Sequence, residues 1–277
     1  MNHQSRPEAE ELAALESFAR DVLEGAGVHA LAYFRRQPEV IDKALPEADL
    51  DPVTLADRAV EDHVRAAILA RHPGHGIVGE EGEPVAGRGD LAWTIDPIDG
   101  TRGFIAGFVH WAALLALTFR GRPLLGVVHQ PYTGETWSGS VSGGARFSRT
   151  GEAQGPSSIR CRPCAGLFEA TLATTDPYLF HDAEAEAFHG VRGRVRLTRY
   201  GADCYAYCML AMGQLDLVVE SGLKPWDVQA LIPLVTAAGG VITDWRGGDC
   251  SAGGQVVAAG DPRTHRAALE LLGPAAG

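Results

Sequence analysis

Cysteine is scarce in this sequence: there are five cysteines among 277 residues, an odd number. A secreted protein stabilised by disulfides would carry a denser and usually even set, so we expect a reducing compartment. Cys161 and Cys164 have half the spacing of a zinc site, and Cys204 and Cys208 stand four residues apart. We assign no metal to them, because thiols are commonly buried as small hydrophobic side chains.

Long apolar runs are also missing. The longest uncharged stretch, residues 228–243, is interrupted by Gln229, Pro233 and a pair of glycines. The first eleven residues carry acids and no apolar segment of the kind that a signal peptide needs. We therefore expect a soluble, cytoplasmic protein that does not enter a membrane.

Positive charge is in short supply. Lys and Arg total 24 against 35 Asp and Glu, a formal net charge of −11, and such a surface repels polyanions. Nucleic acid is therefore not expected as a partner. The sequence also has no Gly-Lys-Ser/Thr run and no serine in a nucleophile-elbow motif, which excludes P-loop enzymes and elbow-type serine hydrolases.

What remains is an ordinary globular composition, with 45% hydrophobic and 21% charged residues. In the first half, apolar spacing predicts helices over residues 8–36 and 54–71 and strands at 76–79, 91–96, 112–119 and 124–130. After a Gly/Ser-rich stretch at 138–158, it predicts helices at 202–212 and 228–238 and strands at 215–219 and 241–243. This alternation predicts a layered α/β architecture. We expect one domain over residues 1–277, with an N-terminal half to about 140 and a C-terminal half from about 150.

Two acids follow the apolar strand that begins near residue 91. Asp96 and Asp99 stand three residues apart around Pro97, which stiffens the turn, and Gly100 permits a tight backbone path. The two carboxylates and the Ile98 carbonyl can then converge on one point, which is the oxygen set that Mg²⁺ prefers. A turn stabilised by an Asx-type hydrogen bond would explain the same residues without a metal.

Other acids lie at similar positions. Glu80 and Glu81 follow the strand at 76–79, and Asp227 lies in the first turn of a predicted helix. Alone, Asp227 would be explained as an acid that complements the helix dipole. If these carboxylates gather with Asp96 and Asp99, cations must be present to offset the cost of burying them. Thr101 can begin a helix whose first N–H groups attract a phosphate oxygen.

These segments together resemble the inositol-monophosphatase-like family of Mg²⁺-dependent phosphatases, over nearly the whole chain. The matching segments are Gly79-Glu80-Glu81, Asp96-Pro97-Ile98-Asp99-Gly100-Thr101, Trp226-Asp227, and residues 238–244, with Lys43 and residues 51–57 upstream. The resemblance implies an αβαβα sandwich of the inositol monophosphatase and fructose-bisphosphatase type.

Within the family, three segments resemble the histidinol-phosphate phosphatase branch: residues 99–107 with Trp111, residues 200–207, and residues 220–233. Two positions depart from that branch, whose members often carry a proline at Val109-His110 and a tyrosine at Trp226. The resemblance thus favours L-histidinol phosphate as substrate, with release of L-histidinol and phosphate in histidine biosynthesis. The alternatives are an inositol-1-monophosphatase, a broad small-alcohol or sugar phosphatase, and a catalytically silent binding protein.

The resemblance also implies roles for single residues. The metal ligands for two or three Mg²⁺ are Glu80, Asp96, the Ile98 carbonyl, Asp99 and Asp227. Glu80 and Thr101 orient a metal-bound water that attacks phosphorus, and Asp57 orients Thr101. The N–H groups of Gly100 and Thr101 bind the phosphate. We also expect a homodimer.

Three further residues are candidates for substrate binding: Asp203, Glu220 and Arg102. The two acids lie in the segments that resemble the histidinol-phosphate phosphatase branch, and an acid beside the phosphate site can pair with a cationic or hydroxylated leaving group. Simpler explanations are that Asp203 caps the helix that follows and that Glu220 is a solvated residue at a strand end.

Overall fold

The computed structural model describes residues 6–36, 40–42, 52–153 and 155–277. Lys43 and Asp51, which take part in the family resemblance, lie outside the described residues. None of the helices described in these ranges is both long and apolar enough to cross a bilayer.

The larger of two main sheets comes from the first half of the chain. Its strands are adjacent in chain order: β3 (Gly76–Gly79), β4 (Leu91–Asp99), β5 (Ala112–Phe119), β6 (Arg122–Gln130), β7 (Glu135–Ser140), β8 (Gly144–Arg149) and β9 (Ser157–Ser158). Only the first pair, β3 and β4, is parallel. The carboxyl ends of β3 and β4 therefore lie at the same edge of this sheet.

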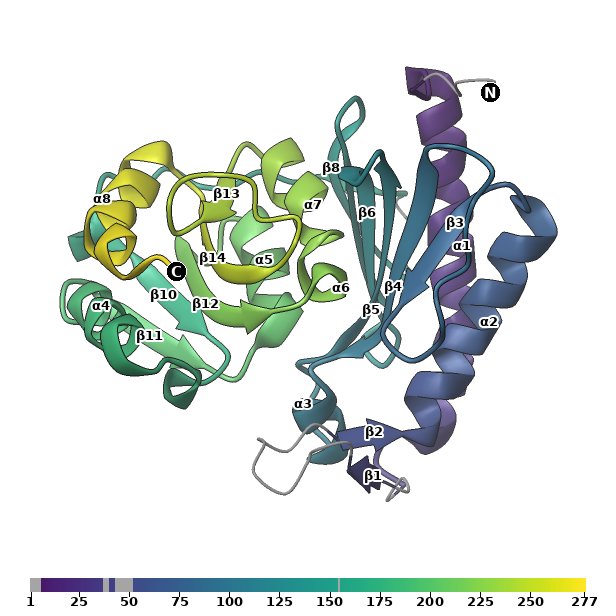
Figure 1. Ribbon diagram of the computed structural model, residues 1–277, viewed down its shortest axis with the longest axis horizontal. Coiled ribbons are helices and arrows are strands. Elements are labelled where there is room, and N and C mark those ends of the chain that lie inside the picture. Colours follow the sequence, from purple (N-terminus) through teal and green to yellow (C-terminus); the bar gives the residue numbers. More distant parts are fainter. Residues whose placement is uncertain (1–5, 37–39, 43–51, 154) are drawn as a thin grey trace.

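The smaller sheet comes from the second half. Its spatial order is β11 (Leu197–Tyr200), β10 (Thr171–Thr174), β12 (Leu217–Leu223), β14 (Gly254–Ala259) and β13 (Val241–Asp244). β10 runs parallel to both of its neighbours, whereas β14 is antiparallel to β12 and β13. A short pair, β1 (Val40–Asp42) and β2 (Pro52–Thr54), lies apart from both sheets (Figure 1).

Helices cover both sheets and fill the space between them (Figure 1). The helices are α1 (Ala9–Tyr33), α2 (Leu55–Arg71), α3 (Thr101–Ile105), α4 (Asp182–Arg192), α5 (Asp203–Ala211), α6 (Pro225–Val228), α7 (Leu231–Ala237) and α8 (Pro262–Leu272). Single 3₁₀ turns occur at Leu167–Glu169, Pro177–Leu179 and Gly273–Ala275.

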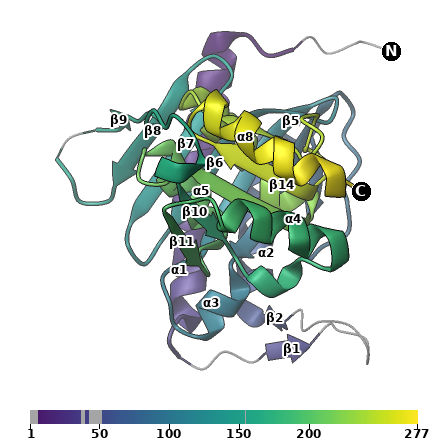
Figure 2. The same ribbon diagram turned by 90° about the vertical axis from the view of Figure 1, so that its left-hand side faces the viewer.

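The side-chain alternation of β5 explains the layering. Leu115 and its odd-numbered neighbours join the core formed with α1 and α2, whereas Leu114 and its even-numbered neighbours join the core formed with α5 and α7. In β12, Val218 faces this second core and Val219 faces a third core under α4 and α8. Figure 2 shows α4 and α8 on the outer side of the smaller sheet. The predicted αβαβα sandwich is confirmed.

Two glycines let the middle helices approach the larger sheet closely. A Cβ atom at Gly139 would lie 2.5 Å from the Cα of Leu234 in α7, and one at Gly126 would overlap the carbonyl of Ala230. Neither position has room for a larger side chain. The middle layer therefore packs directly against the backbones of β6 and β7.

One sequence prediction needs correction, and one segment for which none was made is now assigned. The helix predicted over 228–238 is divided into α6 and α7, because Pro233 has no N–H to donate to the Gln229 carbonyl. The Gly/Ser-rich stretch at 138–158 contains the end of β7 as well as β8 and β9. Its small residues pair as strands along the edge of the larger sheet.

Candidate active site

The end of β4 carries the first two acids of the site. Asp96 pairs with Leu114 of β5, and the register then shifts before Asp99 pairs with Ala112, next to Pro97, which cannot donate a ladder hydrogen bond. Gly100 has a φ of 86°, and a Cβ atom there would lie 2.5 Å from the His110 carbonyl oxygen. The turn that presents both acids therefore requires glycine at position 100.

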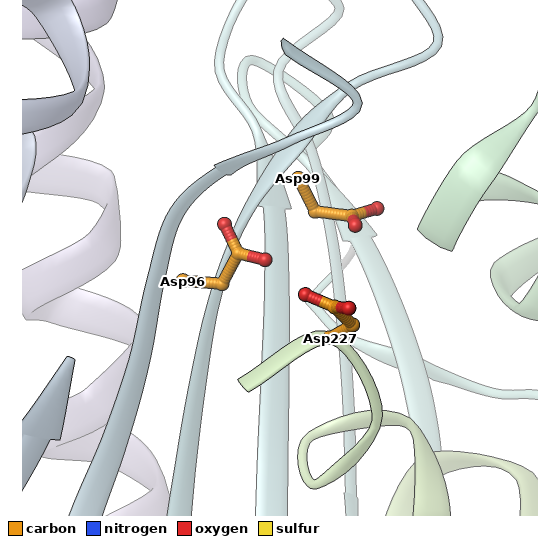
Figure 3. A group of neighbouring side chains, drawn as sticks. All are labelled: Asp96, Asp99 and Asp227. Carbon is orange, nitrogen blue, oxygen red and sulfur yellow. The ribbon is translucent and has the colours of Figure 1, made fainter. Parts of the chain in front are cut away.

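The third acid comes from the middle layer. Helix α6 begins at Pro225, and Asp227 lies in its first turn, where its Oδ2 accepts the Lys224 N–H at 2.7 Å. Figure 3 shows the carboxylates of Asp96, Asp99 and Asp227 pointing toward one another. One oxygen from each lies within 4.8 Å of the other two. Two segments about 130 residues apart in the sequence thus form one acidic cluster.

The electrostatics of this cluster are unfavourable without a cation. Burial raises the pKa of Asp96 well above its usual range, and repulsion from Glu80, Asp99 and Asp227 raises it further. Burial likewise raises the pKa of Asp99 to about 8, with repulsion from Asp203 and Asp227, although the Cys204 N–H donates to its Oδ2 at 2.6 Å. The Oδ1 atom of Asp96 is buried without a hydrogen-bond partner.

These features fit a hard divalent cation. Carboxylate oxygens are the ligands that Mg²⁺ prefers, and a cation would offset the repulsion and occupy the unpartnered Asp96 oxygen. Among the described residues, no other group of three acidic, histidine or cysteine side chains meets the same spacing. Cys161 and Cys164 are both free thiols.

Glu80 and Glu81 behave differently although they are adjacent. The parallel register of β3 and β4 places Gly79 beside Ile95, so Glu80 follows at the level of Asp96, whose pKa its charge raises. The carboxylate of Glu81 instead lies 3.9 Å from Arg58 on α2. Glu80 therefore faces the acidic cluster, although it lies outside the compact group of three aspartates.

Asp57 and Thr101 flank the cluster. Asp57 lies in the first turn of α2, is buried, and contributes to the raised pKa of Asp96. The Thr101 hydroxyl, at the start of α3, donates to the Ile98 carbonyl at 2.9 Å. Ile98 itself is fully buried, which anchors the turn between the two acids of β4.

The candidates for substrate binding also lie near this turn. Asp203 is the first residue of α5, with a strained φ of 44°, and its neighbour Cys204 donates to Asp99. Burial raises the pKa of Asp203 to about 6. The Arg102 guanidinium lies 3.8 Å from Asp176. Position 203 thus begins a helix and also borders the acidic cluster.

Glu220 is 1% exposed, so it is not a solvated residue at a strand end. Its Oε1 accepts the Thr175 N–H at 2.7 Å and the Thr175 hydroxyl at 3.1 Å, and the Thr174 hydroxyl lies 3.3 Å from Oε2. Burial raises its pKa to about 8, and repulsion from Asp203 contributes. With this pKa the carboxyl group is mostly protonated near neutral pH, and a cationic group bound beside it would favour its ionised form.

Sequence reasoning did not find the segment 174–176. Thr175 and Asp176 come directly after β10, and they contact Glu220 and Arg102. The signal that could have identified them is their position at the carboxyl end of a parallel strand, where ligands commonly bind in α/β sheets. β10 has only four residues, too few to show a clear apolar pattern in the sequence.

The layered fold and the partly buried carboxylate cluster define a metal-dependent phosphatase of sugar or alcohol phosphates. The model of the "Inositol monophosphatase family" matches residues 11–275. This chain belongs to that family and is a phosphomonoesterase.

Individual relatives agree with this assignment. The chain is 41% identical to the chloroplastic bifunctional phosphatase IMPL2 of Arabidopsis thaliana, over 87% of this chain and 69% of that protein. It is 34% identical to a histidinol-phosphatase of Chlorobaculum parvum, over 83% of this chain and 85% of that protein. The structure of an inositol monophosphatase from Zymomonas mobilis superimposes with a TM-score of 0.81 at 37% identity, covering 96% of this chain and 100% of that one.

Proposed function

We propose that this protein hydrolyses L-histidinol phosphate to L-histidinol and phosphate, a reaction of histidine biosynthesis. The observation that carries the proposal is the position of two acids: the half-buried Asp203 lies beside Asp99 of the acidic cluster, and the buried Glu220 lies beside Asp203. Histidinol carries an ammonium group and an imidazole, and either cation would form charge-assisted hydrogen bonds with these acids. A bound cation would also favour their ionised forms, which burial disfavours. The relative named histidinol-phosphatase supports this choice.

We further propose that Glu80, Asp96, Asp99, Asp227 and the Ile98 carbonyl hold two or three Mg²⁺. When bound, these ions supply Lewis acidity and lower the pKa of a coordinated water. Side chains of the protein orient and deprotonate this water. The Thr101 hydroxyl orients the attacking water and Asp57 holds Thr101 in place, while Glu80 takes up the proton of that water. As the water oxygen bonds to phosphorus, the bond from phosphorus to the histidinol oxygen breaks, and that oxygen takes up a proton to give the alcohol.

The phosphate is proposed to bind at the start of α3. The first N–H groups of a helix have no acceptor within the helix, so those around Gly100 and Thr101 are suited to phosphate oxygens. Arg102 follows directly and is proposed to contact the substrate, from a position beside Asp176.

Inositol phosphate is the second candidate substrate. It is favoured by the likeness to the Zymomonas mobilis inositol monophosphatase, and Asp203 and Glu220 could accept hydrogen bonds from its hydroxyl groups. The two candidates differ in charge, because only histidinol phosphate carries a cation on the leaving group. That difference can be measured.

The test compares histidinol phosphate, inositol 1-phosphate and para-nitrophenyl phosphate, with Mg²⁺ and with a chelator. We expect chelation to stop all hydrolysis and kcat/KM to be highest for histidinol phosphate. Asp203→Asn and Glu220→Gln should each lower kcat/KM for histidinol phosphate by about 10- to 100-fold, the effect of one charge-assisted hydrogen bond. Hydrolysis of the nitrophenyl ester should change far less. Equal losses on both esters, or a wild-type preference for inositol phosphate, would contradict the proposal.

We also propose that residues 1–277 act as one domain, that the protein is cytoplasmic, and that it forms a homodimer. The single domain is supported by the core that α5 and α7 share with both sheets. Sedimentation velocity at micromolar concentration tests the dimer, which a single monomeric species would exclude.

A further inference from the structure

An ion pair on α2 lies beneath the loop that carries Glu80. Glu61 is 1% exposed, and its Oε1 lies 2.6 Å from the Arg65 Nε one helical turn later. The side chain of Arg65 is only 14% exposed. Asp57 stands one turn before Glu61 on the same helix. No step of the mechanism proposed above uses Glu61 or Arg65.

The Glu61 carboxylate lies against the backbone on both sides of Glu80 and accepts hydrogen bonds from the residues that follow it. Its Oε2 accepts the Glu81 N–H at 2.8 Å, and its Oε1 accepts the Gly82 N–H at 2.9 Å. On the other side of Glu80, a Cβ atom at Gly79 would overlap the Glu61 carboxyl group. The end of β3 therefore passes directly against this carboxylate.

Arg65 completes the contact. Its Nη2 donates to the Gly82 carbonyl at 2.7 Å, and its Nη1 donates to the Glu83 carbonyl at 2.9 Å. The following residues, 83–89, are exposed. Further along, Val85 is tied to Ile77 of β3 by two backbone hydrogen bonds. The bonds from Glu61 and Arg65 therefore fix the start of the loop, at residues 81–83, between β3 and that bridge.

We propose that Glu61 and Arg65 are positioning residues that set the direction of the Glu80 carboxylate and thereby the affinity of the acidic cluster for divalent cations. This inference rests on the proposed role of Glu80 as a metal ligand. Groups that orient a ligand without touching the metal commonly change metal affinity by 10- to 100-fold when they are altered. A neutral Glu61 side chain would weaken its bond to Arg65 and its hydrogen bonds to the loop.

The experiment measures Mg²⁺ binding to the full chain by calorimetry, together with hydrolysis of para-nitrophenyl phosphate over a range of Mg²⁺ concentrations. Glu61→Gln should raise the Kd for Mg²⁺ by about tenfold or more, and added Mg²⁺ should restore part of the lost rate. Arg65→Lys keeps the charge but loses the planar fork, so it should also weaken binding. It also serves as the second variant if Glu61→Gln does not fold.

A matched control is Asp216→Asn. Asp216 is 2% exposed, accepts two hydrogen bonds from Arg162 at 2.6 Å, and accepts the Thr171 N–H at 2.8 Å. It directly precedes β12, whose middle residue is Glu220, and it is not one of the groups whose charge raises the pKa of Asp96 or Asp99. Its loss should lower stability as much as Glu61→Gln does while leaving the Kd for Mg²⁺ unchanged.

The outcomes separate this inference from the function on which it rests. If Asp99→Asn abolishes Mg²⁺ binding but Glu61→Gln and Arg65→Lys bind it as the wild type does, the positioning role is wrong and the proposed function stands. If Asp216→Asn weakens binding as much as Glu61→Gln does, the effect is general destabilisation and the inference also fails. If Asp99→Asn binds Mg²⁺ normally, the metal site itself is wrong.

Discussion

At the scale of single residues, the site depends on carboxylates whose charged forms are destabilised by their surroundings. Asp99 illustrates this, because burial and two neighbouring acids raise its pKa to about 8 while one backbone N–H stabilises its charge. A residue placed against such a cost contributes little to stability by its charge. The role of such a residue is therefore to bind a ligand and not to stabilise the fold.

Asp99→Asn should therefore abolish turnover without unfolding the protein. The amide keeps the shape of the side chain, removes one negative charge from the cluster, and can no longer act as a charged ligand. We expect kcat to fall by at least ~100-fold, since even residues outside the metal ligands cost 10- to 100-fold. Thermal unfolding in the presence of a chelator should occur at or above the wild-type temperature. A rate above about a tenth of wild type at saturating Mg²⁺ would show that the site is wrongly assigned.

Glu80 and Glu81 allow a comparison between adjacent residues of the same type. Glu80 faces Asp96, whereas the Glu81 carboxylate lies beside Arg58. Glu80→Gln should therefore lower kcat far more than Glu81→Gln, whose ion pair with an exposed arginine is worth at most ~1 kcal/mol. Steady-state kinetics with para-nitrophenyl phosphate decides the order. The reverse order would mean that the wrong carboxylate has been placed at the metal.

At the scale of elements, the site requires that α6 keep its place against β4. Gln229 makes this connection: its Oε1 accepts the Thr94 hydroxyl at 2.6 Å, and its Nε2 donates to the Ser251 carbonyl at 2.9 Å. Thr94 precedes Asp96 by two residues and is buried, while Gln229 follows Asp227 by two. The same bond thus joins the two segments that supply the acids.

Gln229→Ala should weaken Mg²⁺ binding and lower stability together. The Thr94 hydroxyl would lose its acceptor in a buried position, at a cost of about 1–3 kcal/mol, and α6 would be free to shift from β4. Urea unfolding and calorimetric Mg²⁺ titration measure the two effects. Gln255→Ala is the control, because Gln255 bonds Glu184 and the Ala275 carbonyl instead. An unchanged Mg²⁺ affinity in Gln229→Ala would contradict this role.

The elements that sequence patterns predict well are those with an apolar period or a continuous apolar run. β5 matches its prediction at both ends because both of its faces are buried, and the helix predicted over 54–71 differs by one residue from α2. The division between α6 and α7 was missed, although Pro233 signals it. Glu61 could not be found from spacing, because its partners Glu81 and Gly82 lie twenty residues further on and meet it only in the folded chain.

At the scale of the whole molecule, the acids of the candidate site come from different layers. Asp96 and Asp99 belong to the larger sheet, Asp227 to the middle helices, and Glu220 to the smaller sheet. The core around α5 and α7 contacts both sheets and holds these layers in register. Folding therefore gathers carboxyl groups whose pKa values are raised, so the free energy of unfolding of the entire chain depends on pH.

The metal-free protein should lose stability as the pH rises from about 6.5 to 8. Burial raises the pKa of both Asp99 and Glu220 to about 8, so the folded state retains protons that the unfolded chain has released. Each such group lowers the free energy of unfolding by at most ~1.4 kcal/mol per pH unit in this window. Burial has the opposite effect on His75 and His129, lowering the pKa of each to about 4. Below about pH 6.5 the unfolded chain therefore binds protons that the folded chain does not, so these histidines lower stability only below this window. Urea unfolding with a chelator should show the decline, Glu220→Gln should reduce its slope, and saturating Mg²⁺ should flatten it because the bound cation stabilises the ionised acids. A chelated protein that is more stable at pH 8 than at pH 6.5 would show that these carboxyl groups are already ionised in the folded state.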